Sequence, residues 1–215
     1  MAIRDMIVEL EIAPGTRLVE NDLAARLNVS KTPIREAIAL LEADGLIDIA
    51  PYRGATVRWL STLEMEEQRF LIDAIELLAF PLVVERIDKA TLTDLAKIVR
   101  EMKRARAKND GPTFRRLTAS THEKMFRPVG YPRLDRFVAM LIGPVSLRYD
   151  RVFVDNFSDT FDLMLKLAVG RFEHIRDGDA EGAADLVRHY RTEIGGLNQS
   201  RLDHPLVAPY FHPPE

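Results

Sequence analysis

Four polar side chains that could contact nucleic acid stand close together near the N-terminus of this 215-residue chain. Arg35 lies on the side of a predicted helix opposite the apolar stripe of Ile34, Ile38 and Leu41, so it should face solvent. Short polar and basic groups at the N-terminal turns of an exposed helix are the groups that read base edges and contact phosphates in DNA. The predicted DNA contacts on this helix are Ser30, Lys31, Thr32 and Arg35.

A second candidate DNA contact lies at the tip of a predicted hairpin. Arg53 stands beside Gly54 there, and glycine lets the backbone approach a sugar-phosphate edge or a minor groove closely. The competing interpretation is a small α/β domain with scattered surface charge. Residues 1–60 carry 7 basic and 9 acidic side chains, which favours that alternative. We favour DNA binding because the acidic side chains fall on segments that should face away from DNA.

Three short helices and a hairpin are predicted to position these side chains. Thr32 is the expected N-cap of the third helix because Pro33 follows it, with Ser30 as the alternative cap. After this helix the apolar period changes from helical to alternating. The expected elements are helices over 3–10, 23–27 and 32–44 and strands over 46–49 and 55–59. This order is that of a winged helix-turn-helix.

The remainder of the chain is predicted to be helical. Seven segments show helical spacing of apolar residues, and Pro81 is expected to kink the first. The segments are 62–88, 92–109, 112–126, 132–142, 145–154, 159–177 and 179–199. The fold class is therefore mainly α, with a winged helix-turn-helix followed by an all-helical bundle. The expected domains are 1–60, 61–200 and an irregular proline-rich tail over 201–215.

The composition excludes several classes of protein. Without any cysteine, the chain has no thiol nucleophile, disulfide or Cys-ligated metal site. No apolar stretch is long enough to span a bilayer, and charged residues interrupt the N-terminal segment where a signal peptide needs an apolar core. We therefore expect a cytoplasmic protein with no membrane partner. The sequence motifs of phosphate-binding loops, dinucleotide folds, serine hydrolases and zinc proteases are missing, so we do not expect an enzyme.

Several short motifs follow one another in the N-terminal part. They are Pro14-Gly15-Thr16-Arg17-Leu18, Leu23-Ala24, LNVSKTPIREA at residues 27–37, Gly45-Leu46 and Arg53-Gly54-Ala55-Thr56-Val57. Their types and order resemble the DNA-binding domain of GntR-superfamily transcription regulators. The resemblance implies a dimer that reads a short inverted repeat in double-stranded DNA. It places Lys31, Thr32, Arg35 and the pair Arg53-Gly54 at contact positions, although position 31 is more often arginine in that family.

A second set of motifs resembles the FCD branch of the same superfamily. It comprises Leu117 with His122, Gly130-Tyr131-Pro132, and Gly178-Asp179-Ala180-Glu181 with Ala183. The resemblance implies a helical bundle that senses a small molecule and dimerises. Many members of the branch hold a divalent metal with an Asp and a His four residues apart and two further His. Only His122 matches a ligand position, because Thr118, Ala168 and Tyr190 occupy the others, so no metal cofactor is expected.

The polar groups left in such a bundle would suit a small-molecule effector, and an inward arginine or histidine would suit a carboxylate. The candidate effector-binding residues are His122, Thr118, Tyr190, Arg69 and Arg148, with Tyr149 and Asn156 as further candidates. The structural alternatives are a hydrogen-bonded core histidine at His122 and a surface or dimer-interface charge at Arg148. A rival function is an effector-independent DNA-binding dimer whose helical domain has lost ligand and metal binding.

A basic run over residues 97–108 is also open to two interpretations. It could form a second face that contacts DNA. We favour the solvated side of an amphipathic helix, with Leu95, Ile98, Val99 and Met102 facing inward.

Overall fold

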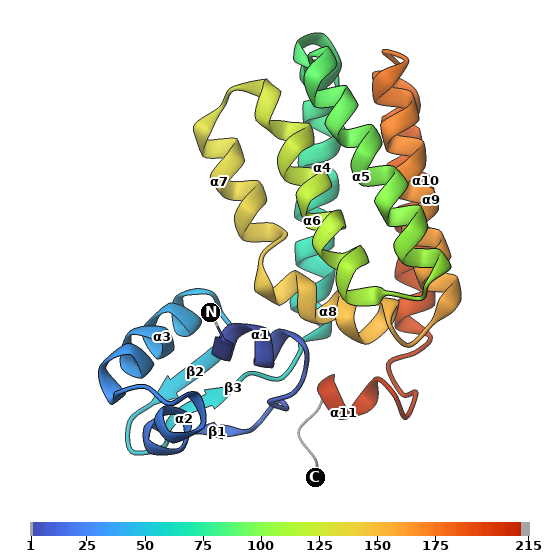
Figure 1. Ribbon diagram of the computed structural model, residues 1–215. Helices are drawn as coiled ribbons and strands as arrows, with labels where there is room; N and C mark the ends of the chain where they lie inside the picture. Colours follow the sequence, from blue (N-terminus) through green and yellow to red (C-terminus); the bar gives the residue numbers. More distant parts are fainter. Residues whose placement is uncertain (1, 212–215) are drawn as a thin grey trace.

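The N-terminal part of the computed structural model, which describes residues 2–211, forms a small head of three helices and a three-stranded sheet (Figure 1). The sheet has the strand order β1-β3-β2, and both pairings are antiparallel. The elements are α1 (Ala2–Val8), β1 (Arg17–Leu18), α2 (Glu20–Leu27), α3 (Lys31–Ala43), β2 (Ile47–Ala50) and β3 (Gly54–Val57). This confirms the predicted winged helix-turn-helix. The sequence did not predict β1, because two residues are too few to show an alternating period.

Local sequence signals explain where the second and third helices begin and end. Asn28 ends α2 in the left-handed conformation with φ of 53°, which asparagine tolerates better than most residues. The N-cap of α3 is Ser30 rather than Thr32, so the alternative cap was right. Pro33 then falls within the first helical turn, where its missing N–H costs no helical hydrogen bond. Ile34, Ile38 and Leu41 are buried in the core of the head, as predicted.

The C-terminal part is a bundle in which all seven predicted helices are found within residues 2–211. They are α4 (Thr62–Arg86), α5 (Lys89–Ala107), α6 (Gly111–Phe126), α7 (Pro132–Leu141), α8 (Pro144–Val154), α9 (Ser158–Arg176) and α10 (Ala180–Gln199). A short 3₁₀ turn, Arg127–Val129, follows α6. Helix α4 continues through Pro81. Side chains of Ser61, Asp88, Asp110 and Asp179 accept a backbone N–H at the start of their helices, which satisfies groups that a helix leaves free.

The predicted irregular tail is more ordered than expected as far as residue 211. It forms a short helix, α11 (Ala208–Phe211), and buries Val207 and Phe211. The apolar side chains between the prolines explain this difference, because they pack against Tyr149 and Phe153 of α8. The last four residues of the predicted tail lie outside the described residues.

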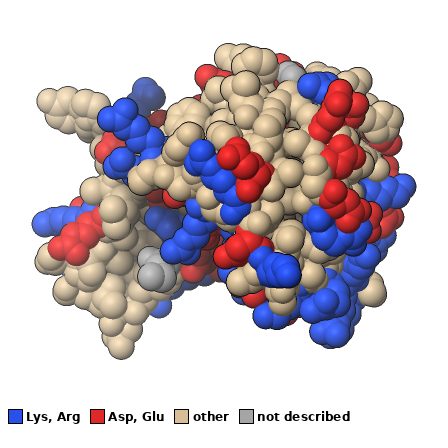
Figure 2. All heavy atoms as spheres, turned by 90° about the horizontal axis from the view of Figure 1, so that it is seen from above, with Lys and Arg blue, Asp and Glu red and all other residues tan. Residues whose placement is uncertain are grey.

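The head and the bundle meet at one end of the bundle, where α8 lies between α1 and the remaining helices (Figure 1). The predicted inward stripe of α5 is confirmed, because Leu95, Ile98, Val99 and Met102 are buried. The basic side chains at 97, 100, 103, 104 and 108 are exposed, as both interpretations of the basic run require. Viewed from above, positive and negative side chains intermingle over much of the bundle surface (Figure 2). None of the described helices is both long and apolar enough to cross a membrane.

Candidate functional site

The N-terminal end of α3 presents its polar side chains to solvent. Ile34 and Ile38 are buried on the opposite face of the helix. Arg35 turns toward α2, where its Nε donates to Oε2 of Glu20 at 2.8 Å. An exposed ion pair of this kind contributes little free energy, so the guanidinium can exchange Glu20 for a base or a phosphate. The structure places all four predicted contacts of this helix, Ser30, Lys31, Thr32 and Arg35, at exposed positions.

The wing tip offers a second set of exposed groups. Arg53 is exposed, and Gly54 has φ of 76°, a conformation that glycine adopts without strain. Tyr52 precedes them with φ of 63° and is fully exposed. A Cβ added at Gly54 would lie 3.5 Å from Nε of Arg17, so a further basic side chain stands beside the tip. Sequence reasoning had not selected Arg17, although it lies within the motif at residues 14–18.

Four of the nine acidic side chains in residues 1–60 pair with arginines away from the N-terminal end of α3. The pairs are Glu11 with Arg26 at 3.8 Å, Asp44 with Arg4 at 2.5 Å, Asp48 with Arg58 at 3.5 Å and Glu9 with Arg115 at 2.5 Å.

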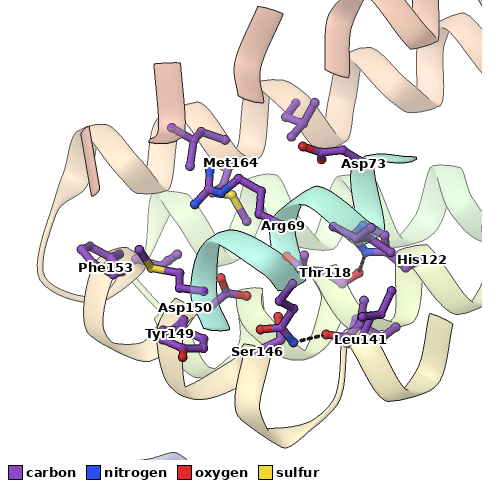
Figure 3. A pocket seen from close by; sticks show the side chains of 18 of the residues that line it. Arg69, Asp73, Thr118, His122, Leu141, Ser146, Tyr149, Asp150, Phe153 and Met164 are labelled. Atoms are coloured by element: carbon purple, nitrogen blue, oxygen red, sulfur yellow. Dashed lines mark hydrogen bonds between the residues drawn. The ribbon is translucent and has the colours of Figure 1, made fainter. Parts of the chain in front are cut away.

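A cavity of about 140 Å³ lies inside the bundle, bounded mainly by α4, α6, α8, α9 and α10 (Figure 3). Arg69, Asp73 and Glu76 enter it from α4, because residues three and four apart share one face of a helix. An apolar cavity of roughly 150 Å³ binds benzene. The cavity is therefore large enough for a small organic molecule, and charged side chains from α4, α8 and α9 line part of it.

Three buried side chains form a network on the wall of this cavity. Nη1 of Arg171 donates to Oε1 of Glu76 and lies 3.0 Å from Nε2 of His122. Nε2 of His122 is also 3.1 Å from Oε1 of Glu76. Burial raises the pKa of Glu76, but the charge of Arg171 and the hydrogen bonds from His122 and Arg171 outweigh it and hold that pKa below its usual value. Glu76 is therefore ionised at neutral pH and fixes the guanidinium.

The other ring nitrogen of His122 sets the tautomer. Nδ1 lies 3.0 Å from the carbonyl oxygen of Thr118, an atom that can only accept a hydrogen bond. Nδ1 must therefore carry a proton. Nε2 lies within reach of both Nη1 of Arg171 and Oε1 of Glu76, so it accepts from the guanidinium when the ring is neutral and donates to the carboxylate when the ring is protonated.

The residues around His122 do not fit a divalent metal ion. A metal would need the lone pair of Nε2, but a positively charged guanidinium already lies beside that nitrogen. The hydroxyl of Thr118, one turn earlier, donates to the carbonyl oxygen of Phe114 at 3.1 Å. Within residues 2–211, no group of three or more His, Cys, Asp or Glu side chains is arranged to hold a metal. Arg171 thus contributes the positive charge beside His122.

Part of the Arg171 guanidinium is left without a partner. Its side chain is 4% exposed, only Nη1 is hydrogen-bonded in the described part of the chain, and Nε is buried with no partner. Nε and Nη2 together form the edge of a guanidinium that binds a carboxylate with two parallel hydrogen bonds. Asn198 on α10 lines the same cavity, and its buried Oδ1 also has no partner.

Asp150 of α8 adds a titratable group to the cavity wall. Burial raises the pKa of Asp150 to about 6, with a small contribution from Asp155, while Arg115, Arg69 and His122 act in the opposite direction. This carboxyl group can therefore change its protonation when a charged molecule enters the cavity.

The structure brings together three of the five predicted effector residues and separates two. Thr118, His122 and Arg69 line the cavity, but Tyr190 and Arg148 do not. Tyr190 was a wrong prediction because Val187, Ile194 and Asn198 form the inward face of α10 instead. The surface or interface position considered for Arg148 was also wrong.

Arg148 is buried at the junction between the head and the bundle. It is 1% exposed, and its Nη2 donates to the carbonyl oxygen of Arg58 at 2.7 Å. Burial lowers the pKa of Arg148 to about 10, so the side chain remains charged at neutral pH. Of the two further candidates, Tyr149 lines the cavity, whereas Asn156 donates to the carbonyl oxygen of Val152 outside it.

Sequence reasoning missed the charged residues that define the cavity. Asp73 and Glu76 interrupt an otherwise apolar run between Phe70 and Val84, and this interruption was a usable signal. Arg171 extends the helical stripe of residues 160, 164 and 167 on α9, where an apolar residue would be expected. Nothing in the local sequence marks Asn198.

Helix α8 connects the cavity with the head. Tyr149 and Asp150 line the cavity, whereas Val145 packs against the core of the head. The hydroxyl of Tyr149 donates to the carbonyl oxygen of Ser61 at 2.9 Å and accepts from its N–H at 3.2 Å. A change at the cavity wall can therefore reach the segment that joins the two parts of the chain.

Charged residues reinforce the same junction. Arg115 of α6 is 2% exposed and forms ion pairs with Glu9, which follows α1, and with Asp155. Arg151 lies 3.6 Å from the same carboxylate of Glu9 and 3.3 Å from Asp155. In addition, the N–H of Leu60 donates to the carbonyl oxygen of Tyr210 at 2.9 Å, so the C-terminal segment also holds the linker.

Comparison with known proteins divides the chain into the same two parts, the head and the bundle. Residues 1–57 match the model of the gntR family of bacterial regulatory proteins, and residues 70–192 match the FCD domain. An uncharacterized HTH-type transcriptional regulator from Streptomyces ambofaciens is 28% identical over 207 residues, which are 95% of this chain and 86% of the relative. The HTH-type transcriptional repressor RspR of Escherichia coli is 43% identical over 74 residues, 34% of this chain and 32% of that protein.

Solved structures share the whole fold. Escherichia coli McbR/YncC has a TM-score of 0.78 with 18% identity and covers 94% of this chain and 95% of its own. A GntR regulator from Rhodococcus has a TM-score of 0.72 with 22% identity, over 93% of this chain and 94% of its own. The chain belongs to the GntR family, in the branch with an FCD domain, and is a DNA-binding transcription regulator with a helical effector-binding domain.

Proposed function

We propose that this regulator binds an inverted-repeat operator as a symmetric homodimer, in the cytoplasm, where it has access to chromosomal DNA. The N-terminal end of α3 supports this proposal most directly, because its polar side chains are exposed to solvent. The opposite face of the helix packs against the core of the head. Each copy would place α3 in a major groove and the wing tip on the adjacent backbone or minor groove. The contacts would come from Ser30, Lys31, Thr32, Arg35, Arg53 and Gly54.

The second copy would pack against an apolar stripe on α4. Leu63, Phe70 and Leu78 are 72%, 53% and 80% exposed, and their spacing places them with Ala74 on one face of the helix. Monomeric proteins rarely leave a long apolar stripe in water, and self-complementary contact of the same patch is how two-fold dimers form.

The effector would be a small organic acid held in the cavity. The observation that supports this is the free Nε–Nη2 edge of Arg171, since Glu76 and His122 engage only Nη1. Binding would shift α8 through Tyr149 and Asp150 and so change the placement of the two heads. The fraction of dimers able to match the operator spacing would change with it.

The test is to select operator fragments from the source genome with the purified protein and then titrate the enriched site. We expect small carboxylic acids to change the operator Kd of the wild type but not of Arg171→Gln. Operator binding that no cavity ligand changes would support the rival function, an effector-independent DNA-binding dimer. Repression is the direction we propose, because RspR and the gluconate operon regulator of Bacillus licheniformis are both named repressors.

A further inference from the structure

Tyr52 adopts a strained backbone conformation at the tip of the wing. The N–H of Arg53 donates to the carbonyl oxygen of Ala50 at 3.2 Å, which closes a tight turn. Pro51 and Tyr52 are its two central residues, and Tyr52 has φ of 63°. In turns with proline first and a positive φ second, the second residue is usually glycine. A bulky side chain there costs free energy, so glycine would suit this turn better than tyrosine.

The fold offers Tyr52 no compensation for this cost. Three other residues besides glycines have a positive φ in the described part of the chain. Asn28 and Asn109 are asparagines, which tolerate the conformation, and Leu10 packs against the apolar cluster of α8 and the C-terminal segment. The ring of Tyr52 is fully exposed, and its side chain forms no hydrogen bond or ring contact within residues 2–211. Strain that the fold does not use suggests a contact outside the chain.

Two exposed guanidiniums accompany this ring at the wing tip. Arg53 is the next residue, and a Cβ added at Gly54 would lie 3.5 Å from Nε of Arg17. Both arginines are exposed, and neither forms an ion pair with another described residue. Their charge is therefore available to a partner.

No carboxylate of the neighbouring strands opposes this charge at the tip. The segments on either side, 12–19 and 49–63, contain no Asp or Glu. The acid nearest to the tip along β2 is Asp48, and its carboxylate lies 3.5 Å from Nε of Arg58. The wing tip thus combines an aromatic surface with positive charge, which matches a polyanion that also has an apolar wall.

We propose that Tyr52 packs its ring into the minor groove of the operator, against the deoxyribose wall. Arg53 would enter the same groove, and Arg17 would bind the phosphates at its edge. The minor groove is roughly 6 Å wide, its A·T-rich stretches attract arginine, and proteins that bind it commonly insert apolar side chains. The inference deepens the proposed function, because it rests on the head binding an operator.

The ring, and neither the turn nor the charge, should carry this contact. Glycine at position 52 would keep the turn and both arginines and would relieve the strain. An uncharged ring adds affinity through the apolar area that it buries, so its contribution should not depend on salt concentration. An arginine on a phosphate contributes through counterion release, which does depend on salt. The salt dependence of binding therefore separates the ring from its neighbours.

The test uses the full-length protein and a duplex of the operator that it enriches from the source genome. Tyr52→Gly and Tyr52→Asn both remove the ring, and both new residues accept a positive φ. We expect the operator Kd to rise about tenfold or more in each, as loss of a buried aromatic contact predicts. Its salt dependence and the melting temperature of the protein should not fall. Hydroxyl-radical footprints should lose the minor-groove protection that the wing gives.

Three further variants serve as controls. Tyr52→Phe keeps the ring and should bind the operator within about twofold of the wild type. Asn109→Gly makes the same backbone change at an exposed position of the bundle with φ of 53°, and it should bind as the wild type does. Arg17→Gln should weaken binding and lower the slope of log Kd against log salt by about one.

The possible failures can be told apart. Unchanged affinity in both ring-deletion variants would overturn the role of Tyr52, leave operator binding in place and assign the ring to a protein partner. Tyr52→Phe binding as weakly as Tyr52→Gly would replace the groove contact by a hydroxyl bond to a phosphate. A lower melting temperature in both ring-deletion variants would show that the ring serves the fold. A wild type that enriches no repeat would overturn the proposed function together with this inference.

Discussion

The head and the cavity use charge in opposite ways. In the head, Arg35 and Glu20 meet at the surface, where water screens them and either partner can be exchanged. In the bundle, Glu76 and Arg171 are 2% and 4% exposed. Removing either side chain leaves the other as a buried charge without compensation. The contrast suggests that exposed pairs keep the DNA-binding residues available, whereas buried pairs fix a cavity in one shape.

The largest expected effect comes from breaking the buried pair. Glu76→Ala leaves Arg171 as an uncompensated buried charge, and we expect a loss of about 3–5 kcal/mol in the free energy of unfolding. Urea denaturation measures it. Glu85→Ala, at an exposed position on the same helix, is the control and should change stability little. Equal effects of the two substitutions would show that the pair is not structurally important.

The carboxylate of Glu76 should also make the stability of the protein sensitive to acid. The pKa of Glu76 in the folded protein lies below its ordinary value of 4.5, so its contribution to stability is present above that pH and is lost as the pH falls through the lower, folded-state value. The stability difference between wild type and Glu76→Gln should therefore shrink as the pH falls below 4.5. A difference that stays constant from pH 7 to pH 3 would contradict the ionised state of Glu76.

A charge on the apolar stripe of α4 tests the dimer. Leu78→Glu would bring two like charges together at the proposed interface and should weaken the dimer by about 2 kcal/mol or more. Sedimentation equilibrium measures this change. Leu40→Glu, at an exposed apolar position on α3 of the head, is the control. If Leu78→Glu leaves the association unchanged, the second copy binds elsewhere.

Breaking the exposed Arg35–Glu20 pair should affect operator binding and not folding. Arg35→Ala should weaken operator binding by about 1–3 kcal/mol and relax sequence preference, with little change in stability. Fluorescence anisotropy on matched and mutated operators separates the two effects. Arg188→Ala, an exposed arginine on α10, should bind as the wild type does.

The smallest expected effect concerns the connection between the two regions. Tyr149→Phe removes the hydroxyl that bridges to Ser61 but keeps the ring in the cavity wall. We expect the affinity for the effector to stay unchanged, while the effect of the effector on the free energy of operator binding falls by about 0.5–2 kcal/mol. Titrating the operator with and without a cavity ligand measures this. Undiminished coupling in the variant would remove Tyr149 from the connection.

The two regions also differ in how far the sequence could predict them. The N-terminal end of α3 is a local feature, so cap residues and one apolar stripe were enough to select Arg35 and its neighbours. The cavity is assembled from several helices far apart in the sequence. Its residues share a wall only after packing, and no spacing rule links Glu76 on α4 to Arg171 on α9. His122 was found because of the family resemblance, whereas Tyr190 was misplaced because the rotation of α10 was unknown.

Parallel selection of genomic fragments can show whether α3 reads a specific operator. Fragments of the source genome are selected in parallel by wild type and by Arg35→Ala, at one fixed moderate salt concentration. We expect the wild type to enrich one inverted repeat, and the variant to lose that enrichment or to enrich a less defined sequence while still binding DNA non-specifically. The same repeat enriched equally by both proteins, or no repeat enriched by either, would contradict it.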